Sequence, residues 1–438
     1  MTIASGAPDP AGHTGRRRRA AVWRVASTFV LHGFQVGYPA FVTYLAATMA
    51  SPAAGSDVVF FLSVGSLILV GLAYGFRYSG TREIALALDE PGRIASVLTA
   101  IFLVQLAAML AAMLACWAGV TWYGAAIGHG TALAVIGFMT LNGVVPTWIF
   151  IALSLQKEFL FYTLSVRVVG LAAALLCFVR HDLAALFVVQ CATMLAIHGA
   201  GVWLLRRRGY VGFAHPFARL FALAGRLLRD GRDIFVMKLG VFSYTSAGVL
   251  ILGLVDSPEA VGAFGLCHRL VTALQQGSAP LFMSAYPLSI RYIAGERQLG
   301  RELLRLNAGA MLCSYGLSLA LALGGPALVR LLGLDDYRGI TACILILSPL
   351  PALIGTSTLL VNNVVLASRR DDIVRTVTLV AGMLGVPAYF VVARWLGLVG
   401  AAMTLTAIET LIAIAYLLIC VRLDLFKHLR YWEKACAD

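Results

Sequence analysis

The sequence has few charged residues, and acidic residues are scarcer than basic ones. Of its 438 residues, 13% are charged, and only 21 are Asp or Glu against 34 Lys and Arg. A soluble domain carries about 25% charged residues on the surface that it exposes to water. With 60% hydrophobic residues and a mean hydropathy of +0.86, this chain has too little polar surface to fold in water. The composition excludes an ordinary soluble domain and predicts an integral membrane protein.

The sequence also lacks the motifs of metal sites, nucleotide sites and nucleophilic catalysis. Its eight cysteines show no paired spacing of the kind that ligates a metal. It contains no glycine-rich phosphate loop with a lysine and no nucleophile elbow. The long alternating strands of a membrane β-barrel are missing as well, which leaves helices as the way to satisfy the backbone in lipid. We therefore expect an all-α fold with no metal, no cofactor and no enzymatic activity.

Apolar segments long enough to cross a membrane occur about twelve times along the chain. They lie near residues 22–47, 58–80, 95–118, 131–153, 163–179, 183–205, 234–255, 260–288, 303–332, 339–366, 374–393 and 398–421. A polar connection at 206–233 divides them into two sets of six. We predict about twelve transmembrane helices in two six-helix lobes, residues 22–205 and 234–421. The remaining residues, 1–21 and 422–438, form two tails.

The basic residues are distributed unevenly between the two sides of the predicted bundle. Of the 34, four fall in loops on one side, and Arg77, Lys238 and Arg269 fall inside predicted spans. The other 27, including those of both tails, lie on the opposite side. Cytoplasmic loops are enriched in Lys and Arg, so we expect both termini in the cytoplasm and the protein in a bacterial inner membrane. A net charge of +13 is also typical of nucleic-acid binding, but cations placed between apolar segments favour membrane anchors, and no nucleic-acid partner is expected.

The connection at 206–233 contains an amphipathic helical pattern. Its apolar residues share one face and its arginines the other, which is typical of a helix on the membrane surface with its cations toward lipid headgroups. A docking site for a partner protein is the alternative.

The two halves also echo each other, with T-R-E-I-A at 81–85 and I-R-Y-I-A at 290–294. This echo predicts two like-oriented repeats and places Arg82 and Arg291 at equivalent span exits, where a headgroup would enter or an ordinary anchor would sit.

Two ionisable residues lie deep inside predicted spans, Arg269 in the eighth and Glu409 in the twelfth. A charge at mid-membrane costs about 2.5–3.5 kcal/mol on insertion scales, so such residues face the bundle interior and mark pathways. Gln276 follows Arg269 at helical spacing and extends its polar face. The two charges have either functional roles, substrate contact for Arg269 and coupling for Glu409, or form a structural ion pair.

Four further polar residues inside or near spans are candidates for substrate contact. Arg77 and Lys238 lie near the ends of the second and seventh spans, where side chains also reach the interface simply to be hydrated. His32 and Gln35 share a face of the first span, where a packed histidine with a backbone partner is the alternative.

Three segments in this order resemble Wzx-type polysaccharide flippases, in the superfamily that includes lipid II flippases and multidrug and toxin extruders. They are G-F-R-Y-S-G-T-R-E-I-A at 75–85, P-T-W-I-F at 146–150, and the pair 244–246 and 260–264 across spans seven and eight. The chain departs from the family pattern by placing His268 before Arg269, where an acid precedes a lysine.

The resemblance implies two six-helix lobes around a central cavity that opens alternately to either side of the membrane. The implied cargo is an undecaprenyl-diphosphate-linked oligosaccharide for lipopolysaccharide or exopolysaccharide, moved from the cytoplasmic to the periplasmic leaflet. Arginines suit its diphosphate, and Trp148 joins the candidate substrate contacts. Expected partners are this cargo, membrane lipids, and a polysaccharide polymerase with its chain-length regulator.

Two other functions remain open. A multidrug or toxin cation antiporter of the same superfamily would prefer carboxylates to the arginines of this interior. A membrane-embedded polysaccharide polymerase or acyltransferase would need a larger outer loop or a His–Asp cluster, and the sequence contains neither.

Overall fold

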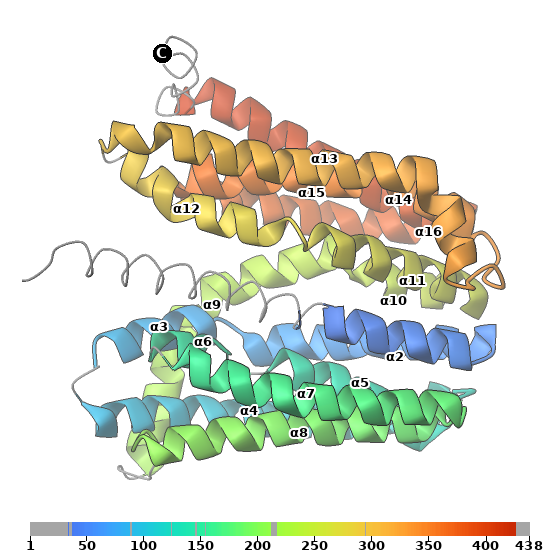
Figure 1. Cartoon of the computed structure of the whole chain (residues 1–438), viewed down its shortest axis with the longest axis horizontal. Helices are drawn as coiled ribbons and strands as arrows, with labels where there is room; N and C mark the ends of the chain where they lie inside the picture. The colour runs from blue at the N-terminus through green and yellow to red at the C-terminus, as the bar shows by residue number, and fades with distance from the viewer. Residues whose placement is uncertain are drawn as a thin grey trace, which may run out of the picture.

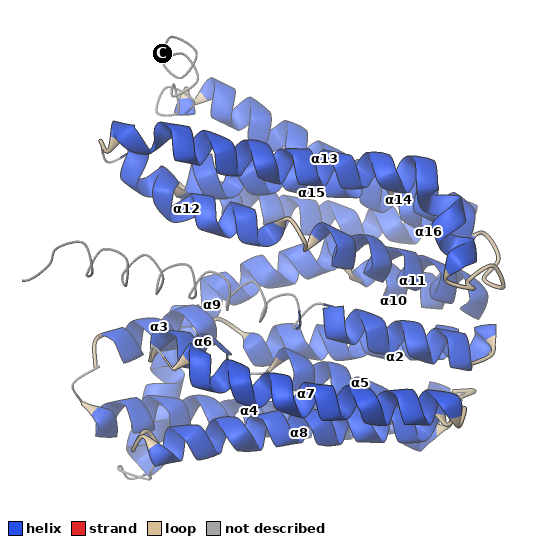
Figure 2. Cartoon of the chain, viewed as in Figure 1, coloured by secondary structure: helices blue, strands red, loops and turns tan. Residues whose placement is uncertain are grey.

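A computed structural model of the chain describes Phe34 and residues 37–87, 90–123, 125–144, 147–153, 155–211, 217–293 and 295–425. Every regular element within these ranges is a helix (Figure 2). Residues 37–49 are helical and are followed by α2 (Pro52–Ala73), α3 (Phe76–Ala85), α4 (Pro91–Tyr123), α5 (His129–Gly143), α6 (Thr147–Ala152), α7 (Gln156–Val179) and α8 (Leu183–Arg207). Then come α9 (Phe217–Thr245), α10 (Ala247–Val255), α11 (Pro258–Gln275), α12 (Ala279–Ile293), η1 (Arg297–Leu299), α13 (Gly300–Leu331), α14 (Ile340–Leu347), α15 (Leu350–Leu359), the π-helix η2 (Leu360–Leu366) and α16 (Asp371–Arg422).

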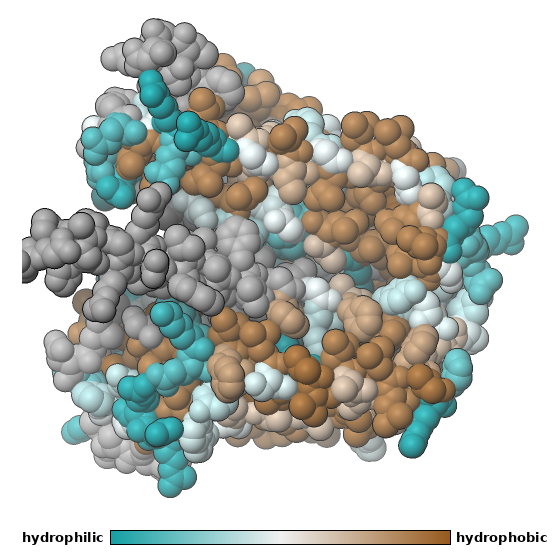
Figure 3. All heavy atoms as spheres, viewed as in Figure 1, coloured by the Kyte–Doolittle hydropathy of each residue, from teal (hydrophilic) through white to brown (hydrophobic). Residues whose placement is uncertain are grey.

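The helices have the length and surface of membrane spans. Eight of those in the described ranges are long and apolar enough to cross a membrane, or nine if α9 and α10, bent by 48°, count as one. The 52-residue α16 is two helical segments joined at Gly397, whose φ of 55° interrupts the helix. Hydrophobic side chains cover the middle of the face in Figure 3, and hydrophilic ones gather at the helix ends. The all-α membrane fold is confirmed, and the number of twelve spans stays a prediction.

Two helices in different halves of the chain, α2 and α11, are built alike. Each has a serine N-cap, Ser51 or Ser257, whose side chain accepts a hydrogen bond from the backbone N–H three residues on. In each the next residue is proline, which suits the first helical position. Each helix then breaks, at Gly75 before α3 and at Gly277 before α12. The shared start and break match the internal repeat that the sequence suggests.

The chain forms two large hydrophobic cores and a smaller third one where α3, α4 and α9 meet. One of the large cores is built from residues between 38 and 205, and the other from residues between 244 and 425 together with Ala47 and Val59. We call residues 37–49 with α2–α8 the N-terminal half and α10–α16 the C-terminal half. In Figure 1 the two halves lie one above the other, with α9 running between them.

Helix α9 connects the two halves. Its first part runs crosswise to the ends of the neighbouring helices in Figure 1, where Ala224 and Leu227 are buried against α3 and α4. Its second part lies along α16. A Cβ on Gly75 would lie 2.5 Å from the Cα of Gly231, so the two backbones cross where only glycines fit. The predicted connection 206–233 therefore comprises the end of α8 and the first part of a helix that continues into the predicted seventh span.

Candidate functional site

A cavity of about 520 Å³ lies between the second part of α9 and helices of the C-terminal half. Residues of α9, α11, α15, η2 and α16 line it, and most of its polar groups are neutral hydroxyls and amides, among them Thr245, Ser246, Thr272, Gln275, Gln276, Ser357, Thr358, Asn362 and Thr378. The π-helix η2 contributes Asn362. Its backbone hydrogen bonds join residues five positions apart instead of four, and such segments occur frequently at functional sites. The cavity is therefore the first candidate for ligand or ion binding.

Glu409 is the carboxylate of this cavity. It is 5% exposed, and Tyr244 and Tyr416 line the same cavity. The Tyr389 hydroxyl donates to the Tyr244 carbonyl oxygen, 3.0 Å away, while the Tyr416 hydroxyl has no hydrogen-bond partner in the described ranges. A buried carboxylate surrounded by neutral oxygens, with space beside it, can take up a proton or a small cation.

Arg269 points out of this cavity and toward the other half of the molecule. It is half-buried, and its Nη2 lies 3.4 Å from the Oγ of Ser63 on α2. Arg269 and Glu409 form no ion pair within the described ranges. The sequence placed Arg269 and Gln276 on one polar face of α11. In the structure Gln276 lines the cavity together with His268, and Arg269 does not. Helix α11 thus presents neutral groups to the cavity and a cation to the N-terminal half.

Two cations lie together where α3 meets α9. Arg77 is exposed near the start of α3, and the half-buried Lys238 of α9 is close enough for the two charges to repel. Among the ion pairs and hydrogen bonds of the described residues, neither side chain has a carboxylate partner. Like charges held together without a counter-ion favour the binding of an anion between them.

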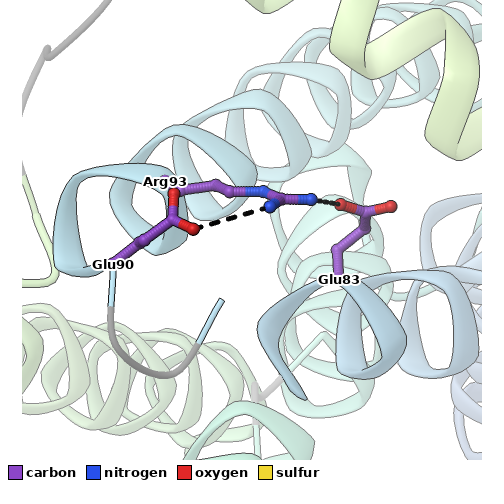
Figure 4. Close-up of polar contacts among 3 residues, drawn as sticks. All are labelled: Glu83, Glu90 and Arg93. Atoms are coloured by element: carbon purple, nitrogen blue, oxygen red, sulfur yellow. Dashed lines mark hydrogen bonds and ion pairs between the residues drawn. The ribbon is translucent and has the colours of Figure 1, made fainter. Parts of the chain in front are cut away.

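The equivalent arginines at the exits of α3 and α12 differ in their surroundings. Both are exposed, but Arg291 forms a bidentate pair with Glu296, and this hydrogen bonding lowers the pKa of Glu296. Arg82 has no recorded ion pair in the described ranges; its neighbour Glu83 pairs instead with Arg93 of α4 at 3.3 Å. Figure 4 shows Arg93 lying between Glu83 and Glu90 across the connection from α3 to α4.

Three predicted substrate contacts remain: Trp148, His32 and Gln35. Trp148 is half-buried, and a Cβ on Gly80 would lie 2.5 Å from its ring, so it fills the space between α6 and α3. His32 and Gln35 lie outside the described residues.

The sequence interpretation missed a buried cation in the N-terminal half. Arg167 of α7 is 1% exposed, donates to the Phe34 carbonyl oxygen and to Asn142 Oδ1, and lies 5.0 Å above the Tyr38 ring. The Tyr38 hydroxyl in turn donates to Gln190 Oε1 at 2.5 Å. Arg167 lies four residues inside the predicted fifth span, 163–179, but it was counted with the cytoplasmic cations; α7 begins seven residues before that predicted start. Its depth in a span was the signal that would have found it.

The two halves are packed tightly together at the end where α2 and α11 begin. At the end where α2 and α11 begin, a Cβ on Gly262 would lie 2.2 Å from Ser56 Oγ, and one on Gly265 would lie 2.0 Å from Val59 Cγ1. At the other end α3 and α12 are separated in Figure 1. The helix ends and loops at the closed end carry four of the 34 basic residues, Arg180, Arg330, Arg338 and Arg394, which places this end outside if the predicted orientation holds.

Two helical halves closed at one end, with polar groups within and between them, define a membrane transporter. A family model described as "Polysaccharide biosynthesis protein" matches residues 24–293, well over half of the chain. The chain belongs to this family of polysaccharide biosynthesis proteins, and the resemblance to Wzx-type flippases is confirmed.

Individual relatives agree with this family. The chain is 24% identical over 351 residues to the Escherichia coli (strain K12) protein named "Putative O-antigen transporter", covering 79% of this chain and 83% of that protein. An inward-facing multidrug resistance MATE family transporter of the MOP superfamily aligns with a TM-score of 0.68 and 12% identity, over 90% of this chain and 95% of its own. The lipid II flippase MurJ in an inward closed conformation aligns at 0.59 and 9%, over 91% and 90%. At such identities the two structures establish the fold.

Proposed function

We propose that this protein is a flippase for undecaprenyl-diphosphate-linked oligosaccharides. It moves them from the cytoplasmic to the periplasmic leaflet of a bacterial inner membrane by alternating access, with both termini in the cytoplasm and without enzymatic chemistry. The observation that carries this proposal is the position of Arg269, a cation without a carboxylate partner that reaches from one half toward the other. A diphosphate crossing a region of low dielectric needs such a partner, and the guanidinium fork suits its oxygens.

In this proposal the cargo meets the cations one after another along a path between the two halves. Arg82 and Arg291 stand at the mouth, Arg77 and Lys238 form the unpaired cationic site beside it, and Arg269 lies deeper between the halves. Contacts of comparable strength along the way let the headgroup advance without being trapped, because a single very tight site would hold it. The closed crossing of α2 and α11 then has to open for release on the other side.

Glu409 is the proposed coupling group. A proton or small cation entering the cavity of the C-terminal half neutralises this carboxylate and changes the electrostatic environment between α9, α11 and α16. The cavity is lined by the second part of α9, whose first part packs on the N-terminal half. Binding at Glu409 is therefore placed to bias how the two halves meet, as a coupling ion must.

A multidrug cation antiporter is the second candidate, and one observation favours it. The 520 Å³ cavity contains a carboxylate and aromatic rings, which together suit an organic cation. In that function the cations between the halves have no substrate role, and Arg269 would only hold α11 against Ser63.

Deletion of the gene in its native host separates the two functions. The flippase predicts loss of surface polysaccharide, accumulation of lipid-linked repeat units in the cytoplasmic membrane, and restoration by the wild-type gene. A panel of cationic drugs tested in parallel should show unchanged sensitivity. Normal polysaccharide together with raised drug sensitivity would overturn the flippase in favour of the antiporter.

A further inference from the structure

A second cationic site lies on the outer surface of the N-terminal half, away from the cations proposed to contact the cargo. It lies where α7 begins and α8 ends, beside an open pocket of about 550 Å³ lined by Glu158, Tyr162, Arg207 and Arg208. This end of the bundle is the one crossed by the first part of α9, and therefore the proposed cytoplasmic end. None of the substrate contacts proposed above belongs to it.

Charge at this site is strongly unbalanced. Lys157, Arg206, Arg207 and Arg208 bring four cations, and Glu158 is the carboxylate among them. Glu158 pairs with Arg208. Within the described residues Arg207 has no recorded ion pair, so a positive charge is left facing the pocket.

Aromatic residues position that charge at the membrane boundary. The guanidinium carbon of Arg207 lies 5.5 Å above the ring of Trp203, and Tyr162 packs edge-on against the same ring at 5.4 Å. Trp203 is 47% exposed and Phe161 is 70% exposed. Exposed aromatic rings beside arginines are typical of the headgroup level, where the apolar body contacts acyl chains and the polar part contacts phosphates. A guanidinium stacked on a ring keeps its in-plane N–H groups available for a phosphate.

We propose that this pocket binds the headgroup of an anionic phospholipid. Arg207 contacts the phosphate, Arg208 and Lys157 strengthen the attraction, and Trp203 and Phe161 lie against the acyl chains. The commitment to an anionic lipid rests on charge complementarity, because a zwitterionic headgroup would bring a second cation to a site already rich in them.

Native mass spectrometry of the full-length protein in detergent tests the proposal, with phosphatidylglycerol and phosphatidylcholine as probes. The wild type should retain phosphatidylglycerol preferentially. Arg207→Gln should bind it about fivefold more weakly, the change expected for one cation near an anionic headgroup. Arg207→Lys keeps the charge and should lose less. Arg180→Gln, an exposed arginine at the opposite end of α7, is the matched control and should behave as the wild type.

Three results would overturn the proposal. These are equal retention of the two lipids by the wild type, undiminished phosphatidylglycerol binding by Arg207→Gln, and binding of a polyprenyl diphosphate but not phosphatidylglycerol at this pocket. Circular dichroism and size exclusion verify that each variant is folded. Since lipid retention is measured without transport, the outcome is independent of the proposed flippase activity.

Discussion

The centres of the two halves carry opposite charges and differ in packing. The N-terminal half encloses Arg167 among Asn142, Tyr38 and Gln190, with the guanidinium bonded on two sides. The C-terminal half instead surrounds the carboxylate of Glu409 with tyrosines beside an open cavity. The positive charge of Arg167, enclosed by these side chains, disfavours the binding of a further cation. The carboxylate of Glu409, with a cavity beside it, favours such binding. We infer that the N-terminal half is the fixed framework and that ion binding belongs to the C-terminal half.

Removing the charge at the centre of each half should produce the largest difference between two variants. Arg167→Met leaves the Phe34 carbonyl and the Asn142 side chain without a donor, and each unsatisfied buried group costs about 1–3 kcal/mol. We expect membrane abundance of this variant to fall severalfold. Glu409→Gln keeps the shape and hydrogen bonding in a site that already has space, so its abundance should stay normal while export falls. Quantitative immunoblots of membranes beside polysaccharide assays measure both, and the reverse pattern would invert the assignment of framework and ion site.

Tying the halves together should stop export without loss of protein. Cysteines replacing Val59 and Gly265 should form a disulfide across the closed end, because a Cβ on Gly265 lies 3.4 Å from that of Val59. We expect oxidation to abolish export and reduction to restore it, with each single-cysteine variant as control. Full export by the quantitatively cross-linked protein would show that this end does not open.

The smallest effect is expected at the two equivalent mouth arginines. Arg291 is exposed and already paired with Glu296, so Arg291→Gln should change export by less than about twofold, in keeping with the small contribution of exposed ion pairs. Arg82→Gln should have the larger effect of the two, because this side chain has no recorded ion pair in the described ranges. Equal effects of both substitutions in a polysaccharide export assay would remove this distinction.

Much of the fold follows from the sequence because lipid imposes simple rules. Span length, apolar composition and serine–proline helix starts are local properties, so the helices were predictable. The breaks between helices were harder to predict. Gly75 and Gly231 are both glycines because two backbones cross there, a contact between residues 156 positions apart that no local pattern reveals.

The site was predicted less completely for a similar reason. Polar residues deep in spans are visible in the sequence, but the direction in which each points depends on helix rotation. His268 and Arg269 are consecutive in the sequence, but His268 lines the cavity and Arg269 reaches toward Ser63 of α2. One alternative from the sequence paired Arg269 with Glu409, and the two form no ion pair in the described part of the chain. Arg167 was overlooked because it lies four residues from the start of the predicted fifth span, near the expected interface, whereas α7 begins seven residues earlier and places the residue well inside the helix.

The role of Arg269 is the central claim and can be tested directly. We would express Arg269→Ala, Arg269→Lys and the Arg269→Ala/Glu409→Gln double variant, and measure membrane abundance beside polysaccharide export. A cation that contacts the diphosphate predicts normal abundance of all three, lost export with alanine, and partial export with lysine, which keeps the charge without the bidentate fork. Low abundance of Arg269→Ala that the double variant restores would contradict this role and make Arg269 the structural partner of Glu409.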